Sequence, residues 1–239
     1  MALILNVDTT GKKAMVCLSD GGAVVHSITD SQPMQHAAFL QPAIQQIMAE
    51  TGLKLPNLDA VSVSNGPGSY TGLRVGLASA KGLCHALGKP LITLDTLQVM
   101  AKGAQLYIGQ KKDQEFNFTD FNYIFCPMVD ARRMEVFFGL YDAKVAPMQM
   151  PAAIVLDEGF VLNELKLGKI FFSGDGSYKW QNSCTNRNAV FLNEPPITEA
   201  LAQLAQNAFD NEVFANLAWS EPFYCKAFYN AAENNKPGL

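Results

Sequence analysis

The sequence lacks several features that would place it in a common class of protein. No two of its five cysteines form a CxxC pair, and all of them stand far apart. This pattern favours reduced thiols over a disulfide framework or a zinc knuckle. No apolar run reaches the length of about 18 residues that a membrane span needs, and the N-terminal MALILNVDTT has no basic stretch or cleavage site. We therefore expect a cytoplasmic protein with no membrane partner.

Charge is also scarce. Charged residues make up 17% of the 239, and the formal net charge is -4 at pH 7. Such a chain has no basic field with which to hold a nucleic-acid backbone, so any tRNA would be held mainly by a partner. The hydrophobic content of 49% argues for a folded globule, and the length suits one large domain or two of about 100 residues.

The first part of the chain alternates strands and helices in the order βββαβαβα. Hydrophobic patterns and turn residues predict strands at 3–7, 14–18 and 23–28, a helix at 34–50, a strand at 60–64, a helix at 69–87, a strand at 91–94 and a helix from residue 96. The Asp-Gly dipeptide in SDGG is typical of a hairpin turn between the second and third strands. Within the first helix, Pro42 predicts a kink, and Gly52 predicts its end.

A similar order begins again after the polar connector GQKKDQEFNFTD. The second series is predicted as strands at 121–129, 135–141 and 152–156, a short helix near 158, strands at 170–173 and 189–192, and a helix at 198–209. Asp8 in NVDTT and Asp130 in MVDAR both stand at the end of a first strand. We therefore predict a duplicated α/β chain with domains at 1–108 and 109–239, and a C-terminal tail from about 215 that packs back on the first domain.

Duplicated halves of this kind resemble the actin, Hsp70 and sugar-kinase superfamily. There, nucleotide lies between two ribonuclease-H-like domains, and a turn after the first strand offers backbone N–H groups to phosphate. Here the turn DTTGKK has its glycine only at the fourth position, and the equivalent turn DARRME has bulky side chains where close approach of a phosphate needs small ones. The segment SGDG suits a strand-to-helix turn better than an adenosine pocket. The residues of a candidate vestigial nucleotide cleft are Asp8, Thr9, Thr10, Asp130, Arg132, Gly174 and Gly176.

The stretch SNGPGSYTGLRVGLASAKGL is rich in glycine but matches neither GxxxxGK nor GxGxxG. Its GPG reads as a tight turn, followed by Ser69 or Thr71 as the N-cap of a helix. Gly72, Gly76 and Ala80 then mark one helix face at steps of four. A mid-helix glycine costs roughly 1 kcal/mol of helix stability relative to alanine. We therefore expect that the missing side chains allow another segment to pack closely against the helix. Two alternatives stay open: the helix lies tightly on its own sheet, or this face receives a second protein.

The same stretch closely resembles GPGSFTGxRxGxxxAxGL of the TsaB family, also called YeaZ. The segments VDTT, MQHAAFLQPAI, VDARRMEVFFGLYD, SGDG and SEPFYCK follow in the order that this family shows. Two departures are visible: Tyr70 replaces the usual phenylalanine, and Cys225 and Lys226 stand where Leu-Arg is usual. The second departure changes the residues available for a basic contact near the C-terminus.

This resemblance implies a non-catalytic scaffold with two actin-like domains. TsaB-like proteins work with the paralogue TsaD and with TsaE to make threonylcarbamoyladenosine beside the anticodon of tRNAs that read codons starting with A. TsaD performs the transfer, from threonylcarbamoyl-adenylate supplied by TsaC. The resemblance further implies a homodimer when the chain is alone, tRNA contact only through the complex, no cofactor of its own, and nucleotide only at the interface with TsaD.

The predicted partner interface, carried over from the family, lies on the helices at 34–50 and 69–87. Its residues are His36, Leu40, Ile44, Tyr70, Gly72, Arg74, Val75, Gly76, Ser79, Ala80 and Leu83. These helices would pack against the matching helices of TsaD or of a second copy. On this hypothesis Gly76→Leu leaves the monomer folded but prevents TsaD binding.

No catalytic or metal-ligating set can be assembled from the sequence. TsaD-like relatives hold a metal with HxxxH, whereas here His36 is followed at the fourth position by Leu40. His26 and His85 are isolated, and no Ser, His and Asp arrangement follows from spacing. We therefore predict no metal and no catalytic residue. Two alternatives remain: an actin-like small-molecule phosphotransferase and a metal-dependent, glycoprotease-like peptidase.

Overall fold

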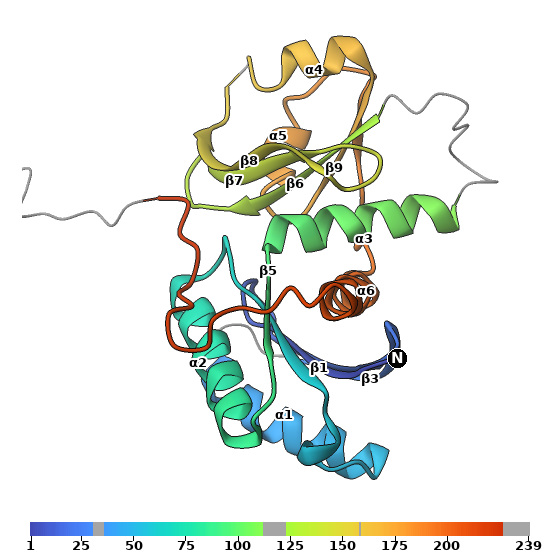
Figure 1. Cartoon of the computed structure of the whole chain (residues 1–239). Coiled ribbons are helices and arrows are strands. Elements are labelled where there is room, and N and C mark those ends of the chain that lie inside the picture. The colour runs from blue at the N-terminus through green and yellow to red at the C-terminus, as the bar shows by residue number, and fades with distance from the viewer. Residues whose placement is uncertain (31–35, 112–122, 158, 227–239) are drawn as a thin grey trace, which may run out of the picture.

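The computed structural model describes residues 1–30, 36–111, 123–157 and 159–226. It consists of two five-stranded sheets with helices on their outer faces and two helices between them (Figure 1). From one outer face to the other, the layers are α1 and α2, the first sheet, α6, α3, the second sheet, and α4 with α5.

The first sheet has the strand order β3-β2-β1-β4-β5. Its elements are β1 (Leu3–Asp8), β2 (Met15–Asp20), β3 (Ala23–Thr29), α1 (His36–Thr51), a 3-10 turn (Leu55–Asn57), β4 (Ala60–Ser64), α2 (Tyr70–Leu87), β5 (Leu91–Leu94) and α3 (Thr96–Gln110). The first three strands form an antiparallel meander, and β4 and β5 run parallel to β1. The predicted order is confirmed within the described residues, and α1 continues through Pro42 and ends just before Gly52.

The second sheet repeats this topology as β10-β9-β6-β7-β8. Its elements are β6 (Tyr123–Asp130), β7 (Glu135–Tyr141), β8 (Pro147–Val155), α4 (Leu162–Leu167), β9 (Lys169–Ser173), α5 (Tyr178–Gln181), β10 (Ala189–Phe191) and α6 (Ile197–Asp210). The duplicated α/β architecture is therefore confirmed. Strand β8 is longer than expected, and the predicted helix near 158 begins at Leu162; residues 34, 35, 121, 122 and 158 lie outside the described part of the chain.

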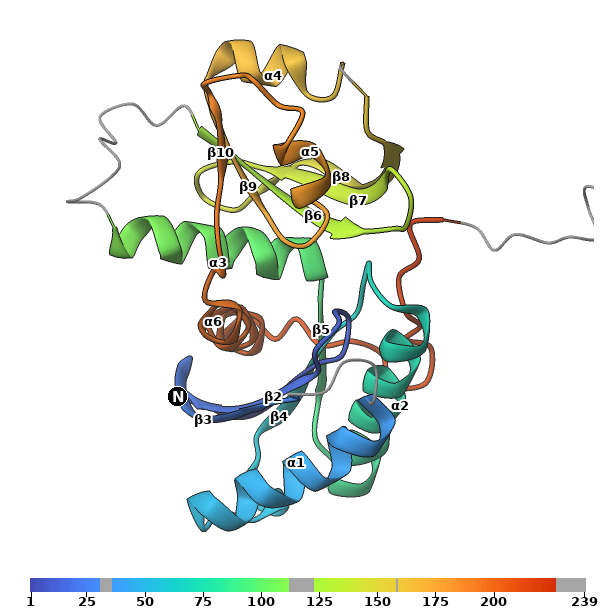
Figure 2. The same ribbon diagram turned by 180° about the vertical axis from the view of Figure 1, so that it is seen from behind.

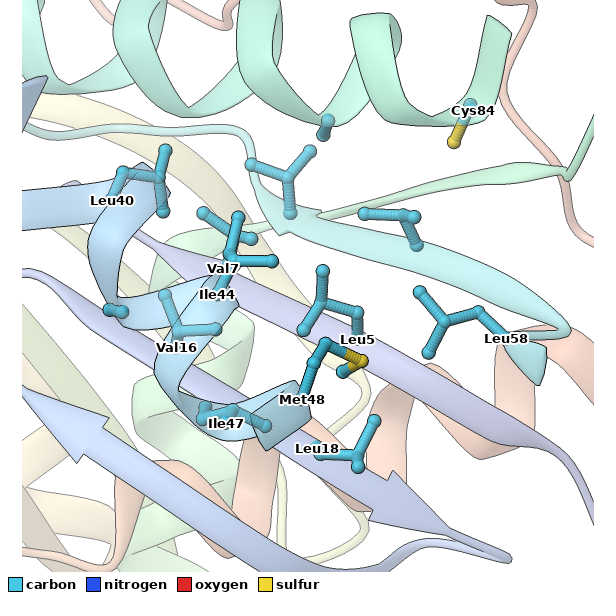
Figure 3. Close-up of a cluster of buried hydrophobic side chains, with 14 of the residues drawn as sticks. Leu5, Val7, Val16, Leu18, Leu40, Ile44, Ile47, Met48, Leu58 and Cys84 are labelled. Carbon is cyan, nitrogen blue, oxygen red and sulfur yellow. The ribbon is translucent and has the colours of Figure 1, made fainter. Parts of the chain in front are cut away.

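The outer face of the first sheet carries a core that holds α1 and α2 in place (Figure 3). Leu5 and Val7 from β1 meet Ile44, Ile47 and Met48 from α1. Burying each such side chain contributes about 1.5–3 kcal/mol, so the inner faces of both helices are committed to this sheet.

Helix α6 packs on the first sheet although it follows the strands of the second in sequence (Figure 2). Its buried Ala200, Leu201 and Ala205 meet Ile4 of β1 and Ile92 of β5, while its other side contacts α3. The chain that follows α6 stays on the first sheet, where Ala215 bridges to Leu91. The domain boundaries at 108 and 109 stay a prediction.

Candidate functional site

The turn after β1 is ordered by the carboxylate of Asp8. One oxygen of Asp8 accepts hydrogen bonds from the backbone N–H of Thr10 at 2.8 Å and from the Thr10 hydroxyl at 2.7 Å. The other oxygen accepts from the hydroxyl of Ser64, at the end of β4, at 2.9 Å. Because Asp8 is buried and has three donors within the chain, its role in the described structure is to hold the turn.

Helix α2 lies directly on this turn. Of the two residues predicted as N-cap, Ser69 and Thr71, Ser69 takes this position and accepts a hydrogen bond from the backbone N–H of Gly72. The Thr9 hydroxyl donates to the carbonyl oxygen of Gly72 at 2.7 Å, and the backbone N–H of Ser69 donates to the carbonyl oxygen of Thr10 at 2.8 Å. A Cβ atom at Gly72 or at Gly76 would overlap Thr9. The space left by these glycines is therefore filled by the chain's own β1–β2 turn.

This packing decides between the two alternatives for the small residues of α2. Gly72, Gly76 and Ala80 face inward, so their assignment to a partner-binding face is wrong. Leu40 and Ile44 are likewise buried in the core of the first sheet and are not available to a partner. The expectation that Gly76→Leu leaves the fold intact fails for the same reason, because the added side chain would meet Thr9.

His36 is buried as well, but the other residues predicted for the partner interface lie nearer the surface. Tyr70 is 44% exposed and Arg74 is exposed. The guanidinium group of Arg74 donates to the Tyr70 hydroxyl at 2.7 Å and lies 4.9 Å from the centre of its ring. Val75, Ser79 and Leu83 are half-buried along the same helix.

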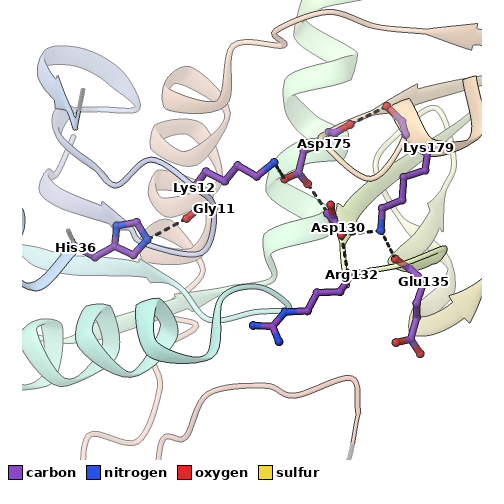
Figure 4. Close-up of polar contacts among 10 residues, drawn as sticks. Gly11, Lys12, His36, Asp130, Arg132, Glu135, Asp175 and Lys179 are labelled. Carbon is purple, nitrogen blue, oxygen red and sulfur yellow. Dashed lines mark hydrogen bonds and ion pairs between the residues drawn. The ribbon is translucent and has the colours of Figure 1, made fainter. Parts of the chain in front are cut away.

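His36 begins α1 and is 6% exposed. Its Nε2 lies 3.0 Å from the carbonyl oxygen of Gly11 (Figure 4), so the imidazole joins α1 to the β1–β2 turn. A Cβ atom at Gly72 would lie 3.0 Å from its Cδ2 atom. The prediction that His36 makes a polar contact at a helix start is confirmed.

In the second half, the turn after β6 is built around Asp130. Its Oδ1 accepts from the backbone N–H of Arg132 and from Nζ of Lys179, both at 2.6 Å (Figure 4). Partial burial raises the pKa of Asp130, but the hydrogen bonds from Lys179 and Arg132 outweigh this effect and lower it. Arg132 and Arg133 adopt left-handed backbone angles, with φ of 74° and 48°. The carboxylate is thus paired with a lysine of its own domain.

The SGDG segment forms the strand-to-helix turn that its sequence favoured. Gly174 and Gly176 lie against the backbone of β6, where the backbone N–H of Gly176 donates to the carbonyl oxygen of Met128 at 3.0 Å. Between them, Asp175 accepts from the backbone N–H of Asp130 at 2.9 Å, and its other oxygen lies 3.3 Å from Nζ of Lys12. This ion pair joins the two halves of the molecule. Neither Lys12 nor Asp175 was among the residues predicted for a site, although each lies in a polar turn that directly follows a predicted strand.

A cavity of about 640 Å³ lies between the halves beside this ion pair. Of the predicted cleft residues, Asp8 and Thr10 line it, whereas Thr9, Asp130, Arg132, Gly174 and Gly176 do not. Its other lining residues are Gly11, Lys12, Lys13, Met15, Thr29, Thr96, Met100, Val129, Asp175, Glu194, Pro195, Pro196, Ile197, Thr198 and Glu199. The lining combines apolar side chains with four acidic residues and with the two lysines Lys12 and Lys13.

Comparison with known proteins decides the family. The family model for TsaD, described as tRNA N6-adenosine threonylcarbamoyltransferase, matches residues 23–227. The tRNA threonylcarbamoyladenosine biosynthesis protein TsaB of Escherichia coli is 30% identical over 138 residues, which cover 58% of this chain and 54% of that protein. The TsaB of Haemophilus influenzae is 36% identical over 101 residues, 42% of each chain. This chain belongs to the TsaB (YeaZ) family.

The solved structures agree on the fold of this TsaB-family chain. A Pseudomonas aeruginosa protein, described as similar to peptidase YEAZ, superposes with a TM-score of 0.77 at 24% identity and covers 95% of this chain and 100% of its own. By contrast, the sequence match to the first curated relatives spans only about half of their length.

Two further features concern the part of the TsaB-family chain that the structure describes. Within it, no group of three or more His, Cys, Asp or Glu side chains lies together in a way that could hold a metal ion. None of the described helices is long and apolar enough to cross a membrane.

Proposed function

We propose that this chain is a non-catalytic subunit that acts with a TsaD-like paralogue and a TsaE-like ATPase in the threonylcarbamoylation of tRNA adenosine. The observation that carries the proposal is the state of the two carboxylates that end the first strands. Asp8 is held by Thr10 and Ser64, and Asp130 is held by Lys179 and the backbone of Arg132. Both carboxylates therefore order turns of their own halves, which supports a structural role for them.

We infer that the partner binds the outer faces of α1 and α2. The inner stripe of small residues on α2 packs against the β1–β2 turn, but a second stripe of small residues lies on the outer face of this helix. Ala78, Gly82 and Ala86 are exposed at steps of four, and a Cβ atom at Gly82 would meet nothing within 4 Å. Small exposed residues let another helix come close. Tyr70 and Arg74 continue this surface toward the start of α2.

Helix α1 offers a matching face beside α2. Ala37, Ala38 and Ala49 are exposed on it, together with Gln41 and Gln45. A surface of small and uncharged side chains suits helix packing against a paralogue or, when the chain is alone, against a second copy. We propose that tRNA and nucleotide are engaged only in the resulting complex, with nucleotide at the interface with the TsaD-like partner. The separated thiols favour a reducing compartment such as the cytoplasm.

A pair of variants at Gly82 tests the proposed surface. Gly82→Arg places a long side chain where the structure has open space, so the free chain should fold normally but no longer co-elute with the TsaD-like protein. Gly82→Ala is the matched control, and it should bind as the wild type does. Co-elution of Gly82→Arg at the wild-type level would reject this surface.

The non-catalytic role has its own test. Depletion of the chain should remove threonylcarbamoyladenosine from bulk tRNA, as measured by nucleoside mass spectrometry. Re-expressed Asp130→Asn should restore the nucleoside, because Asn keeps an oxygen that accepts from Lys179 and Arg132. If Asp130→Asn accumulates as a folded protein and binds its partner but restores nothing, a catalytic carboxylate must be considered instead.

A further inference from the structure

The last described part of the chain crosses from the first half to the second. Residues 215–226, here called the strap, leave the edge of the first sheet and run beside α2 toward the turn between β6 and β7 (Figure 1). The backbone N–H of Ala215 donates to Leu91 at 2.8 Å. Along α2, Nζ of Lys81 donates to the carbonyl oxygens of Ala218 at 3.2 Å and Ser220 at 3.1 Å. The strap is therefore fixed to the first half at its start.

Farther along, the strap covers the turn that precedes α2. The backbone N–H of Phe223 donates to the carbonyl oxygen of Asn65 at 2.8 Å, and the Asn65 amide donates to the carbonyl oxygen of Glu221 at 2.9 Å. Gly66 has a φ of 119°, and a Cβ atom there would overlap the carbonyl oxygen of Phe223. The ring of Tyr224 then lies 5.4 Å from the ring of Tyr70, the first residue of α2. The strap thus contacts the N-terminal end of α2.

The end of the strap reaches the second half. Nζ of Lys226 lies 2.9 Å from one carboxylate oxygen of Glu135 at the start of β7 and 3.0 Å from the other. Glu135 is close to the Asp130 turn, because its backbone carbonyl accepts from Lys179 at 2.8 Å. The strap therefore ends in an ion pair between the halves.

A second ion pair joins the halves through the β1–β2 turn. Lys12 reaches Asp175 from the β1–β2 turn (Figure 4), and that turn is held by Thr9 against Gly72 of α2. Both ion pairs thus originate in segments that contact the first turns of α2. They end on residues beside Asp130: Asp175 accepts from the Asp130 backbone N–H, and Lys179 donates both to the Asp130 carboxylate and to the backbone carbonyl of Glu135.

We propose that Lys226–Glu135 and Lys12–Asp175 are two clasps that hold the halves together, the second of them at the edge of the cavity, and that they couple the closed arrangement of the halves to the N-terminal end of α2. Both clasps are partly exposed, with side-chain exposures of 62% and 22% for the first and 69% and 35% for the second. Exposed ion pairs favour the paired state by only about twofold to fivefold. Such clasps are weak enough to open. A molecule that binds the N-terminal end of α2 more tightly when the clasps are closed would therefore also favour the closed arrangement of the halves.

Hydrogen exchange on the full-length chain tests the clasp at Lys226. At low salt, Lys226→Glu and Glu135→Lys should each raise exchange at the Phe223 amide by about twofold to fivefold, because the strap loses its far attachment. The double variant Lys226→Glu with Glu135→Lys should restore wild-type exchange. Lys54→Glu makes the same charge change at another exposed lysine and should leave the Phe223 amide unaffected. If the Phe223 amide of the double variant exchanges as fast as in the single variants, the clasp between Lys226 and Glu135 is wrong.

The coupling needs a separate measurement. Lys12→Gln removes the clasp to Asp175, and residue 12 lies outside the strap. The variant should nevertheless raise the rate of hydrogen exchange at the Phe223 amide by about twofold. The difference should vanish near 1 M salt, where charges are screened within about 3 Å. If Lys12→Gln changes exchange only around the cavity, the two clasps act independently and the coupling is wrong.

Discussion

Thr9 and Gly72 are in direct contact: the side-chain hydroxyl of Thr9 donates to the Gly72 carbonyl oxygen at 2.7 Å, and a Cβ atom at Gly72 would overlap the Thr9 carbonyl oxygen. The relationship joins the first turn of the chain to the start of α2, 63 residues later. It explains why a glycine-rich helix follows a strand in a protein that matches no phosphate-binding loop.

The contact predicts opposite effects for two glycine variants in one helix. Gly72→Ala should destabilise the protein by about 1–3 kcal/mol, since its new methyl group overlaps the Thr9 backbone. Gly82→Ala should stabilise it by up to about 1 kcal/mol, because the site is open and alanine favours helix. Urea unfolding of both variants measures the difference. A Gly72→Ala variant that is at least as stable as the wild type would mean that α2 does not pack on the β1–β2 turn.

Removing the Asp8 carboxylate should also weaken the fold. Asp8→Ala leaves the donors on Thr10 and Ser64 buried without their acceptor, at a cost of about 3 kcal/mol. Ser64→Ala removes only one of these hydrogen bonds and should cost about 1 kcal/mol. The comparison is made by chemical denaturation, and an Asp8→Ala variant as stable as the wild type would contradict the structural role of this carboxylate.

Asp95 gives the stability a specific pH dependence. This residue caps α3 and accepts from the Gln98 backbone N–H at 2.8 Å and from the Tyr141 hydroxyl at 3.1 Å. Burial raises its pKa above the ordinary 3.8, and the hydrogen bonds only partly oppose this. The folded state then binds the proton more tightly than the unfolded state, so this contribution to stability is complete below pH 3.8 and is lost as the pH rises through the raised pKa.

Asp95→Asn should remove this dependence. Asparagine keeps the cap and an oxygen for Tyr141 but carries no charge. The free energy of unfolding of the variant, relative to the wild type, should therefore increase between pH 4 and pH 7. Unfolding curves measured at several pH values check this, and a constant difference across the range would show that Asp95 is ionised without cost.

The five thiols should differ sharply in reactivity. Burial raises the pKa of Cys17 and Cys225 to about 12 and that of Cys84 to about 11, and it raises the pKa of Cys126 well above its usual range. A pKa of 12 makes the thiolate fraction at pH 8 roughly a thousandfold smaller than a pKa of 9. Cys184 is half-buried and lines a surface cavity, so iodoacetamide followed by peptide mass spectrometry should find it alkylated before these four cysteines. Early modification of Cys17 would indicate that β2 opens readily.

Local patterns in the sequence were sufficient for the elements and their order. The Asp-Gly turn, the N-cap at Ser69 and the β-prone runs depend on neighbours within a few residues, and these predictions were confirmed. Boundaries differed most at β8, where Met148 and Met150 extend the strand on an exposed edge without a clear alternation of apolar residues. An edge strand is specified mainly by its one partner, which the sequence does not reveal.

The sequence by itself determined the duplicated α/β order, the family and the absence of an HxxxH pair, because each depends on residue type and spacing along the chain. Only the tertiary structure decided which face of α2 is inside, since Gly72 and Ala78 look equally small in sequence and differ in what lies above them. It also decided that Lys12 pairs with Asp175 and Lys226 with Glu135. Such pairs join residues that are far apart in the sequence and meet only in the folded chain, so local spacing does not predict them.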